Sequence, residues 1–314
     1  MNKQFTFSRE YIYGRYITTA YSNNQDKHYS KDSFYHHPVL DASQASSLIK
    51  NVINTGTPFM AGRFGANELS AIKTFDFEIT SKYQKTLSIL GLNAGFFPQT
   101  IDAGMHFKDI MISEIPSADL IGIWPLPFEG YYLKQYGSPD LKYTWLRYLE
   151  PWQCIESPWS AALKGKKVLV IHPFAESIAK QYKKRELLFP KTGILPQFDL
   201  EILQSVQTSG GNIDSRFHDW FEALNWMKKE VSKKSFDIAL LGCGAYGFPL
   251  AAHIKKEGRQ AIHLGGATQI LFGIMGTRWE NDPAVQKLKN DAWIRPSNSE
   301  RPKNASNIEN ACYW

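Results

Sequence analysis

The sequence predicts an α/β fold with a Rossmann-like, mostly parallel sheet and helices on both faces. Short unbroken apolar runs, such as KVLVI at 167–171 and FDIALL at 236–241, alternate with segments of helical periodicity. Strands that are buried on both faces read as such runs, and their alternation with helices indicates a parallel sheet. Polar or glycine residues follow four of the expected strands: Arg63, His172, Gly242 and Gly265. Because ligands bind beyond the carboxyl ends of parallel strands, we expect a site there.

Capping residues and helical periodicity bound the expected helices. Asp41 or Ser43 can cap the first helix, which ends near Gly56. The clearest helix spans 216–231, where apolar residues recur on one face. The other expected helices cover 67–75, 81–90, 102–115, 176–188, 249–256 and 268–274. The expected strands cover 58–64, 118–124, 167–171, 198–206, 236–241 and 260–264.

A chain of 314 residues allows one large domain or two small ones. We expect one Rossmann-like domain over 41–280. Residues 1–40 are polar and aromatic without clear periodicity, and they predict an arm laid over the core. The Pro-, Gly- and Tyr-rich stretch 125–151 predicts an insertion or lid, whose Tyr and Trp side chains either pack or contact sugar. The polar segment 281–314 predicts a tail.

Composition narrows the class of protein. The net charge of +6 suits anionic ligands, but the basic residues are spread along the chain, so we expect no nucleic-acid binding. Three scattered cysteines predict neither a disulfide framework nor a zinc site. No apolar run reaches the ~20 residues of a membrane-spanning helix, and no secretory signal opens the chain, so we expect a cytoplasmic protein. The basic helix around Lys183 predicts either a solvated face or peripheral contact with an acidic membrane surface.

The sequence GCGAYG at 242–247 matches GxGxxG between an expected strand and an expected helix. Gly242, Gly244 and Gly247, with Tyr246 among them, let the backbone approach a diphosphate at the free N–H groups of the helix start. The alternative is a tight turn without a ligand. No carboxylate follows about 20 positions later to hold a ribose, so NAD and S-adenosylmethionine are disfavoured.

A second corner, HLGGATQ at 263–269, repeats the order of strand, paired glycines and helix. Gly265 and Gly266 form the corner, Thr268 can cap the following helix, and Gln269 can donate to a base or phosphate. The two corners together predict a diphosphate cradle. A second tight turn is the alternative.

The sequence GRFGANE at 62–68 places a cation and a carboxylate at a third strand-to-helix corner. Arg63 can pair bidentately with a phosphate and stabilise a departing nucleotide diphosphate. Glu68 can hold a divalent cation or act as general base on an acceptor hydroxyl. A salt bridge between the two is the structural alternative. His172 can bind phosphate or sugar, or serve as a hydrogen-bonded core residue.

Four segments carry a resemblance to a known family: GRFGANEL, IHPF, LGCGAYGFPLAAHIKKEGRQAIHLGG and ATQILFGIMGTRW. Between about Asp41 and Trp279 the chain resembles bacterial GT-D-like glycosyltransferases, many of them capsule or surface-polysaccharide proteins. The resemblance implies a Rossmann-like core, a UDP-sugar donor and a divalent metal, Mn or Mg. The family places Asp-x-Glu just after an Arg-Phe-Gly-like corner. Glu68 matches the Glu, but Ala66 stands at the Asp position, so one metal ligand of the family is missing.

The resemblance and the motifs together predict transfer of a sugar from a nucleotide-diphosphate sugar to a hydroxyl acceptor. The resemblance implies a glycan or lipid-linked acceptor in surface-polysaccharide or glycan biosynthesis. The alternative is a non-catalytic nucleotide- or sugar-binding scaffold of a polysaccharide-assembly complex. No GxSxG, HExxH or GxxxxGK[ST] motif occurs, so covalent hydrolysis, zinc proteolysis and P-loop ATP hydrolysis lack support.

Overall fold

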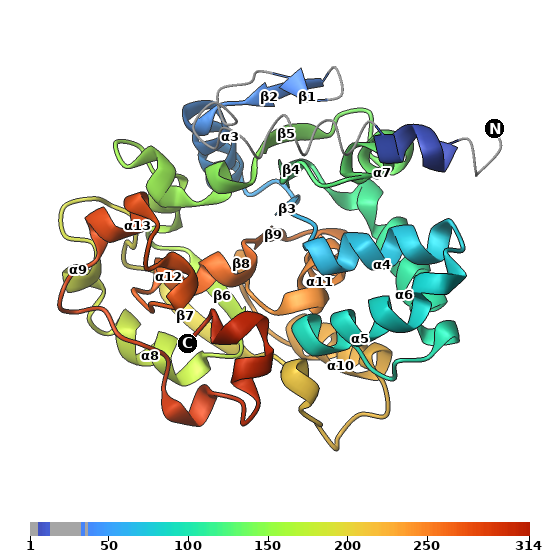
Figure 1. Ribbon diagram of the computed structural model, residues 1–314. Coiled ribbons are helices and arrows are strands. Elements are labelled where there is room, and N and C mark those ends of the chain that lie inside the picture. Colours follow the sequence, from blue (N-terminus) through green and yellow to red (C-terminus); the bar gives the residue numbers. More distant parts are fainter. Residues whose placement is uncertain (1–5, 13–32, 35–36) are drawn as a thin grey trace.

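The computed structural model describes residues 6–12, 33–34 and 37–314. These residues form one sheet of nine strands in the order β1-β2-β5-β4-β3-β9-β8-β6-β7 (Figure 1). Neighbouring strands run parallel, except that β1 and β2 are antiparallel. The predicted α/β class is confirmed. The strands are β1 (Ser33–Phe34), β2 (His37–Leu40), β3 (Phe59–Gly62), β4 (Leu120–Ile123), β5 (Lys142–Trp145), β6 (Lys167–His172), β7 (Asp199–Gln204), β8 (Ile238–Leu241) and β9 (Gln260–His263).

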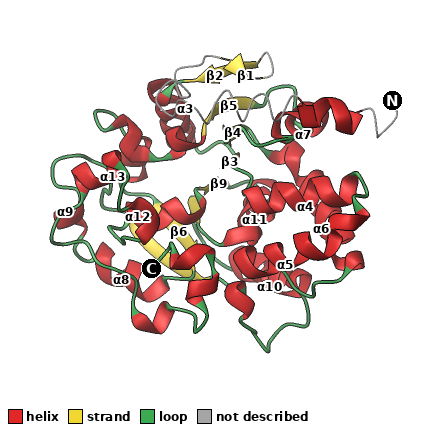
Figure 2. Cartoon of the chain, viewed as in Figure 1, coloured by secondary structure: helices red, strands yellow, loops and turns green. Residues whose placement is uncertain are grey.

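Helices cover both faces of this sheet (Figure 2). The expected helices alternate with strands as predicted, and α7 and α13 are additional helices that the sequence did not predict. From residue 37 onwards they are α3 (Ala42–Thr55), α4 (Ala66–Asp76), α5 (Tyr83–Ala94), α6 (Ile101–Glu114), α7 (Glu129–Tyr136), α8 (Ala175–Tyr182), α9 (Arg185–Leu188), α10 (Trp220–Ser232), α11 (Gly247–Lys256), α12 (Thr268–Leu271) and α13 (Pro283–Leu288).

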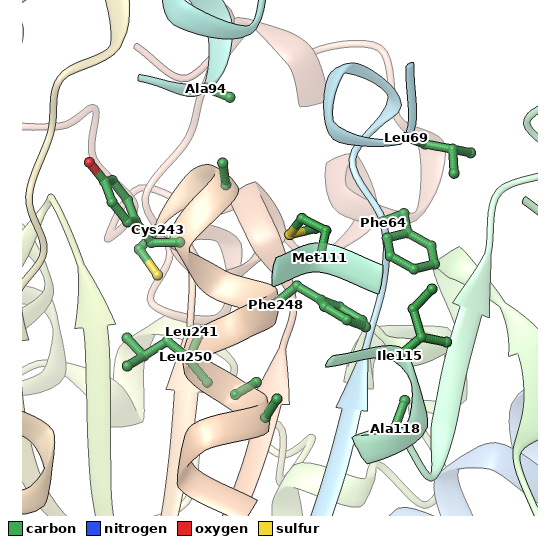
Figure 3. Close-up of a cluster of buried hydrophobic side chains, with 14 of the residues drawn as sticks. Phe64, Leu69, Ala94, Met111, Ile115, Ala118, Leu241, Cys243, Phe248 and Leu250 are labelled. Atoms are coloured by element: carbon green, nitrogen blue, oxygen red, sulfur yellow. The ribbon is translucent and has the colours of Figure 1, made fainter. Parts of the chain in front are cut away.

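Alternate residues of the strands enter two separate hydrophobic cores. On β6, Leu169 and Ile171 join the first core, whereas Val168 and Val170 join the second. The first core lies between the sheet and α4, α5, α6, α10 and α11, and Figure 3 shows part of it. The second is formed with α3, α8 and α12. A strand with a core on each side needs apolar residues at every position, which explains the unbroken runs in the sequence.

Most expected helices are confirmed, with changes at their ends. Asp41 caps α3 in a capping box with Gln44, and Gly56 ends it in the left-handed conformation. The helix expected from 216 begins instead at Trp220, because the side chain of Asp219 accepts the N–H of Glu222 and sets the first turn. The segment 176–188, expected as one helix, forms two helices, α8 and α9. The helix expected over 268–274 is shorter and ends at Leu271, the last residue of α12.

The stretch 125–151, expected as an insertion or lid, supplies part of the sheet. It contains α7 and then β5, which pairs with β2 on one side and β4 on the other. Tyr143 and Trp145 of β5 are core residues, since both are buried. The interpretation as a lid is therefore wrong for this part. The aromatic residues that suggested sugar contact here fill the interior instead.

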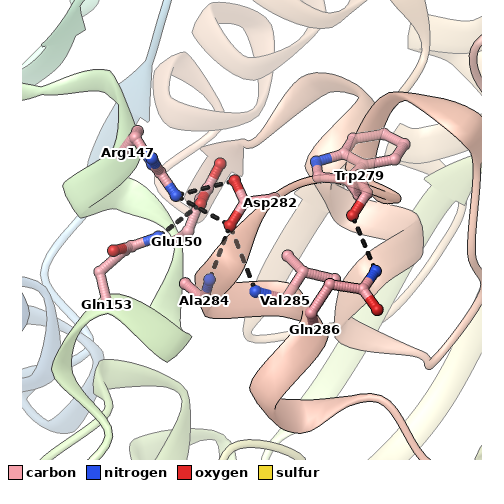
Figure 4. Close-up of polar contacts among 8 residues, drawn as sticks. All are labelled: Arg147, Glu150, Gln153, Trp279, Asp282, Ala284, Val285 and Gln286. Carbon is pink, nitrogen blue, oxygen red and sulfur yellow. Dashed lines mark hydrogen bonds and ion pairs between the residues drawn. The ribbon is translucent and has the colours of Figure 1, made fainter. Parts of the chain in front are cut away.

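The segment 281–314 packs against the domain along its length. Asp282 caps α13 by accepting the N–H of Ala284 and also pairs with Arg147 at 2.7 Å (Figure 4). Further along, the buried carboxylate of Glu300 accepts the N–H of Glu176 at 2.7 Å, at the start of α8. The expected tail is thus held by side chains that satisfy backbone groups at helix starts.

Residues 1–5, 13–32 and 35–36 of the expected arm, His36 among them, lie outside the described residues. The described helix at 6–12 packs its Phe7 ring 5.4 Å from Phe77 and 5.3 Å from Phe128. Residues 37–40 form β2, so the end of the expected arm belongs to the sheet. Among the helices described, none has both the length and the apolar character needed to cross a membrane.

Candidate functional site

A pocket of about 1040 Å³, counted with its mouth, lies at the carboxyl edge of the sheet. Every predicted site residue except Gly247 lines this pocket. Six strands deliver a lining residue at or just after their last position, as parallel strands do at a shared edge. These residues are Arg63 after β3, Trp124 after β4, His172 on β6, Ser205 after β7, Gly242 after β8 and His263 on β9.

Arg63 brings its guanidinium to this pocket. Its Nε is buried without a hydrogen-bond partner, and no hydrogen bond or ion pair joins Arg63 to another residue of the described chain. The predicted salt bridge to Glu68 is therefore not formed. The nearest aromatic group is Trp124, whose ring centre lies 6.0 Å from Cζ. A buried donor without a partner costs free energy, so this position is suited to an incoming anion.

Glu68 lies in the first turn of α4 with its carboxyl folded back over Gly65. A side chain at Gly65 would displace this carboxyl. Burial raises the pKa of Glu68, against the lowering effects of its own backbone N–H and of Arg63. The residue as a whole is 8% exposed and lines the pocket. A buried carboxyl with a raised pKa can take a proton from a hydroxyl.

The residues present do not supply a binding site for a divalent metal. Such a metal takes six or more oxygen ligands, of which the protein usually supplies one or two carboxylates and the substrate phosphates and water the rest. Within the described ranges, no three His, Cys, Asp or Glu side chains are placed to hold an ion. Ala66 occupies the position where the family has Asp, and Glu68 is the one predicted ligand. The donor set does not fit the metal that the resemblance implies.

The two glycine corners touch each other. A β-carbon at Gly242 would lie 2.7 Å from the carbonyl oxygen of Gly265 and 2.8 Å from Oγ1 of Thr268. Gly265 has φ of 61° and Gly244 has φ of 57°, a region that disfavours other residues. Only glycine therefore fits at these corners. The helix after the second corner, α12, has four residues, which is too short for a helix dipole to matter. This corner can therefore bind an anion only through its own backbone groups.

Two buried histidines line the pocket in their neutral forms. Burial lowers the pKa of His172 to about 3, and its Nδ1 accepts the N–H of Phe174 at 3.0 Å. The proton therefore sits on Nε2 of His172. Burial and, to a smaller extent, the charge of Arg63 lower the pKa of His263 to about 3. Nδ1 of His263 lies 3.3 Å from the carbonyl of Leu241, which makes this nitrogen the donor and leaves Nε2 as an acceptor.

Three of the predicted cofactor-binding residues have structural contacts. A side chain at Gly247 would collide with the His263 ring, so this glycine allows close packing of α11 on β9 and does not line the pocket. Tyr246 stacks its ring on Trp220, with centroids 5.0 Å apart. The amide of Gln269 donates to the carbonyls of Ile274 at 3.0 Å and Tyr313 at 3.1 Å. These contacts give each of the three residues a structural role, and Tyr246 and Gln269 also line the pocket, so their roles in ligand binding stay predictions.

Sequence reasoning missed the contribution of the C-terminal segment. Arg278, Glu309 and Tyr313 line the pocket, and the ring of Tyr313 covers Gly266. Trp124, which is 41% exposed, also lines it, and its backbone N–H is held by the carboxylate of Glu129 at 3.1 Å. Trp124 and these C-terminal residues are too far apart in the sequence for a motif spacing to connect them. Of these residues, Arg278 lies in a segment that carries the resemblance, GTRW.

The sequence model of the GT-D fold-like domain matches residues 40–271. Two solved structures are similar in fold, each with 15% identity and a TM-score of 0.41. One is a selenomethionine-substituted domain of unknown function 1792, matched over 74% of this chain and 79% of that one. The other is described as a domain of unknown function 1792 with a distinct glycosyltransferase fold, matched over 73% and 78%. No curated protein matches the sequence significantly. Since the matched range covers well over half of the sequence, the chain belongs to the GT-D fold-like domain family.

Proposed function

We propose that this protein is a glycosyltransferase that moves a sugar from a nucleotide-diphosphate sugar, such as a UDP-sugar, to a hydroxyl acceptor. The observation that carries the proposal is the guanidinium of Arg63, which has no hydrogen-bond or ion-pair partner among the described residues and lies beside two glycine corners in the pocket. A diphosphate leaving group needs a fixed cation and free N–H donors where its charge develops. Membership of the GT-D fold-like family supports the same reaction class.

In the proposed reaction, the acceptor oxygen forms a bond to the anomeric carbon of the sugar. The bond from that carbon to the diphosphate oxygen breaks, and the diphosphate keeps the electron pair. Arg63 and the N–H groups of the corners at Gly242 and Gly265 stabilise the added negative charge. Nε2–H of His172 donates to a phosphate oxygen without being charged. Glu68 takes the acceptor proton, which its raised pKa favours.

Catalysis of this kind depends on positioning and on preorganised charge. Trp124 offers an aromatic face beside Arg63 on which the sugar or base can pack. No step is assigned to a metal, because the donor set does not fit one. The acceptor is proposed to be a glycan or lipid-linked glycan of surface-polysaccharide assembly, and the reaction cytoplasmic. Peripheral contact with an acidic membrane through the basic helix around Lys183 belongs to the same proposal.

The test is turnover of a panel of nucleotide sugars by the full chain, with thermal shift on the same panel. A donor raises the melting temperature by mass action and releases its nucleotide diphosphate over time. The Arg63→Ala variant is expected to weaken both effects, while Arg185→Ala, whose side chain lies outside the pocket lining, retains them. A panel in which no nucleotide sugar stabilises the protein or is turned over would contradict the proposal.

A second candidate is a scaffold protein that binds a nucleotide or sugar without turnover. The observation that favours it is Ala66 at the family's Asp position, together with the missing metal ligand set in the described chain. The same panel separates the two candidates. Stabilisation by a nucleotide sugar without release of its nucleotide, at long incubation and high protein concentration, would favour the scaffold.

A further inference from the structure

A second guanidinium lines the same pocket. Arg278 comes from a single turn of helix, Thr277–Trp279, beyond the last strand of the sheet. Its Nη1 donates to the hydroxyl of Tyr313 at 3.0 Å, and its Cζ lies 4.7 Å from the centre of that ring. These contacts fix the orientation of the guanidinium. Its Nη2 forms an ion pair with the carboxylate of Glu309, which also lines the pocket.

Glu309 lies on a strained stretch of backbone. Glu309, Asn310 and Ala311 have φ values of 47°, 57° and 57°, one after another. Each residue with a β-carbon in this region costs about 1–2 kcal/mol, so other contacts must hold the stretch. These contacts are made by the two residues that come directly after the stretch. The backbone N–H of Arg278 donates to the carbonyl of Cys312 at 3.0 Å, and the side-chain amide of Gln269 donates to the carbonyl of Tyr313 at 3.1 Å.

The charges of Arg63, Glu68, Arg278 and Glu309 act on one another across the pocket. The carboxylate of Glu309 contributes to the raised pKa of Glu68. Burial raises the pKa of Tyr313 to about 12, against the lowering effects of Arg278 and Arg63. The two guanidinium groups therefore face a shared space. One of them has no anionic partner in the described chain, and the other is paired with a carboxylate on the strained stretch.

We propose that Arg278 is a second binding group for the diphosphate of the donor and that Glu309 occupies its place until the donor arrives. The proposal rests on the proposed function and extends it to the donor site. A phosphate oxygen replaces the Glu309 carboxylate on Arg278 by the same charge-assisted hydrogen bond. The Glu309 carboxylate and the diphosphate of the donor thus compete for the guanidinium of Arg278.

The test is calorimetric binding of UDP and of inorganic pyrophosphate to the full chain and three variants. Glu309→Gln removes the competing charge and keeps the shape, so both ligands are expected to bind about two- to fivefold more tightly, the worth of a partly exposed ion pair. Arg278→Gln is expected to weaken both by about tenfold, the worth of one charged hydrogen bond. In the Arg278→Gln background, Glu309→Gln should no longer tighten binding, because the competition acts through Arg278.

The direction of the Glu309→Gln effect separates competition from a structural role. A substitution that only loosens the C-terminal segment would weaken binding and lower the melting temperature. The matched control is Glu280→Gln, which removes another ion pair of this region, with Arg295, outside the pocket lining. Its affinity for both ligands is expected to equal that of the natural sequence. Unchanged or weaker binding by Glu309→Gln, or equal tightening by Glu280→Gln, overturns the proposal.

The outcome also distinguishes this proposal from the proposed function. Turnover of a nucleotide sugar with no tightening in Glu309→Gln overturns the competition and leaves the transferase. Tightening in Glu309→Gln without turnover of any donor supports the competition and overturns the transferase. A natural chain that binds neither UDP nor pyrophosphate overturns both.

Discussion

The backbone of Gly265 lies directly against the side chain of Arg63. A β-carbon at Gly265 would be 2.9 Å from Nε and 2.9 Å from Nη2 of the guanidinium. Two corners separated by some two hundred positions in the sequence therefore meet around one group. Any larger residue at position 265 would push the guanidinium away from this backbone.

Arg63→Ala is expected to lower turnover by about tenfold or more, because the developing charge on the diphosphate loses a fixed cation. Steady-state rates on the best donor of the panel measure the effect. Arg63→Lys keeps the charge but loses the fork of donors, so it should restore only part of the rate. Arg185→Ala is the control, since Arg185 pairs with Glu186 outside the pocket lining. Equal rates for Arg63→Ala and the natural sequence would remove Arg63 from the site.

Gly265→Ala is expected to lose donor affinity by about tenfold, because the new methyl group displaces the guanidinium and its charged hydrogen bond. The matched control is Gly258→Ala. Gly258 has φ of 82°, comparable with the 61° of Gly265, but nothing lies within 4 Å of its β-carbon position. Both variants should lose about 1–2 kcal/mol of stability from the left-handed backbone, and only Gly265→Ala should lose affinity. Similar UDP affinities in the two variants would contradict the prediction.

Gly247→Ala tests whether this glycine serves packing or ligand binding. The methyl group would collide with the ring of His263, so we expect a loss of about 1–3 kcal/mol in the free energy of unfolding, typical of overpacking. In the His263→Ala background the same substitution should cost less, because the ring is gone. Urea unfolding of the four proteins measures the coupling. An unchanged stability with lost UDP affinity would instead favour the phosphate-binding role predicted from the sequence.

The stabilisation that comes from keeping His172 and His263 neutral is expected to be lost as the pH drops from 6.5 towards 3, while the buried carboxyls of Glu129 and Glu150, with pKa values raised to about 8 and about 7, contribute in the opposite direction. The pKa values of His172 and His263 are lowered from 6.5 to about 3 by burial, so in this window these two histidines bind more protons in the unfolded chain. The stabilisation is complete above the unfolded value and is lost as the pH falls towards the folded one. Each histidine contributes up to about 1.4 kcal/mol per pH unit. Urea unfolding at several pH values from 7 down to 4 is compared between the natural chain and a variant with both histidines changed to Gln, and the natural chain should lose more stability than the variant over this range.

Removal of divalent metal is expected to leave UDP affinity unchanged. The described side chains provide no ligand set for an ion, and Arg63 supplies positive charge at the diphosphate instead. Calorimetry in EDTA and in Mn²⁺ makes the comparison. Restoring the family pattern with Ala66→Asp is the informative variant, since it adds a carboxylate near Glu68. Strong metal dependence in the natural chain would contradict the prediction.

The periodicity of the sequence was sufficient for the fold class and for most of the elements. Runs such as KVLVI predict a strand because alternate residues enter cores on opposite faces, and this requirement acts on every position locally. The corners at Arg63, Gly242 and Gly265 were predictable for a similar reason. Parallel strands bring their carboxyl ends to one edge whatever their order in the sheet.

Two kinds of feature depended on tertiary contacts. Tyr143 and Trp145 could not be told from sugar-binding aromatics, because a buried ring and a ligand-facing ring have the same local sequence. Likewise, GxGxxG cannot reveal that Gly247 makes room for His263, a residue of the next strand.

The sequence by itself determined a parallel α/β sheet and the edge at which polar residues gather, since both follow from patterns within short segments. The tertiary structure alone decided that Arg63 has no partner in the described chain, while Arg278 is paired with Glu309. The physical reason is that burial and charge pairing depend on groups that the chain brings together from distant segments. No local pattern encodes which of two guanidinium groups will be neutralised.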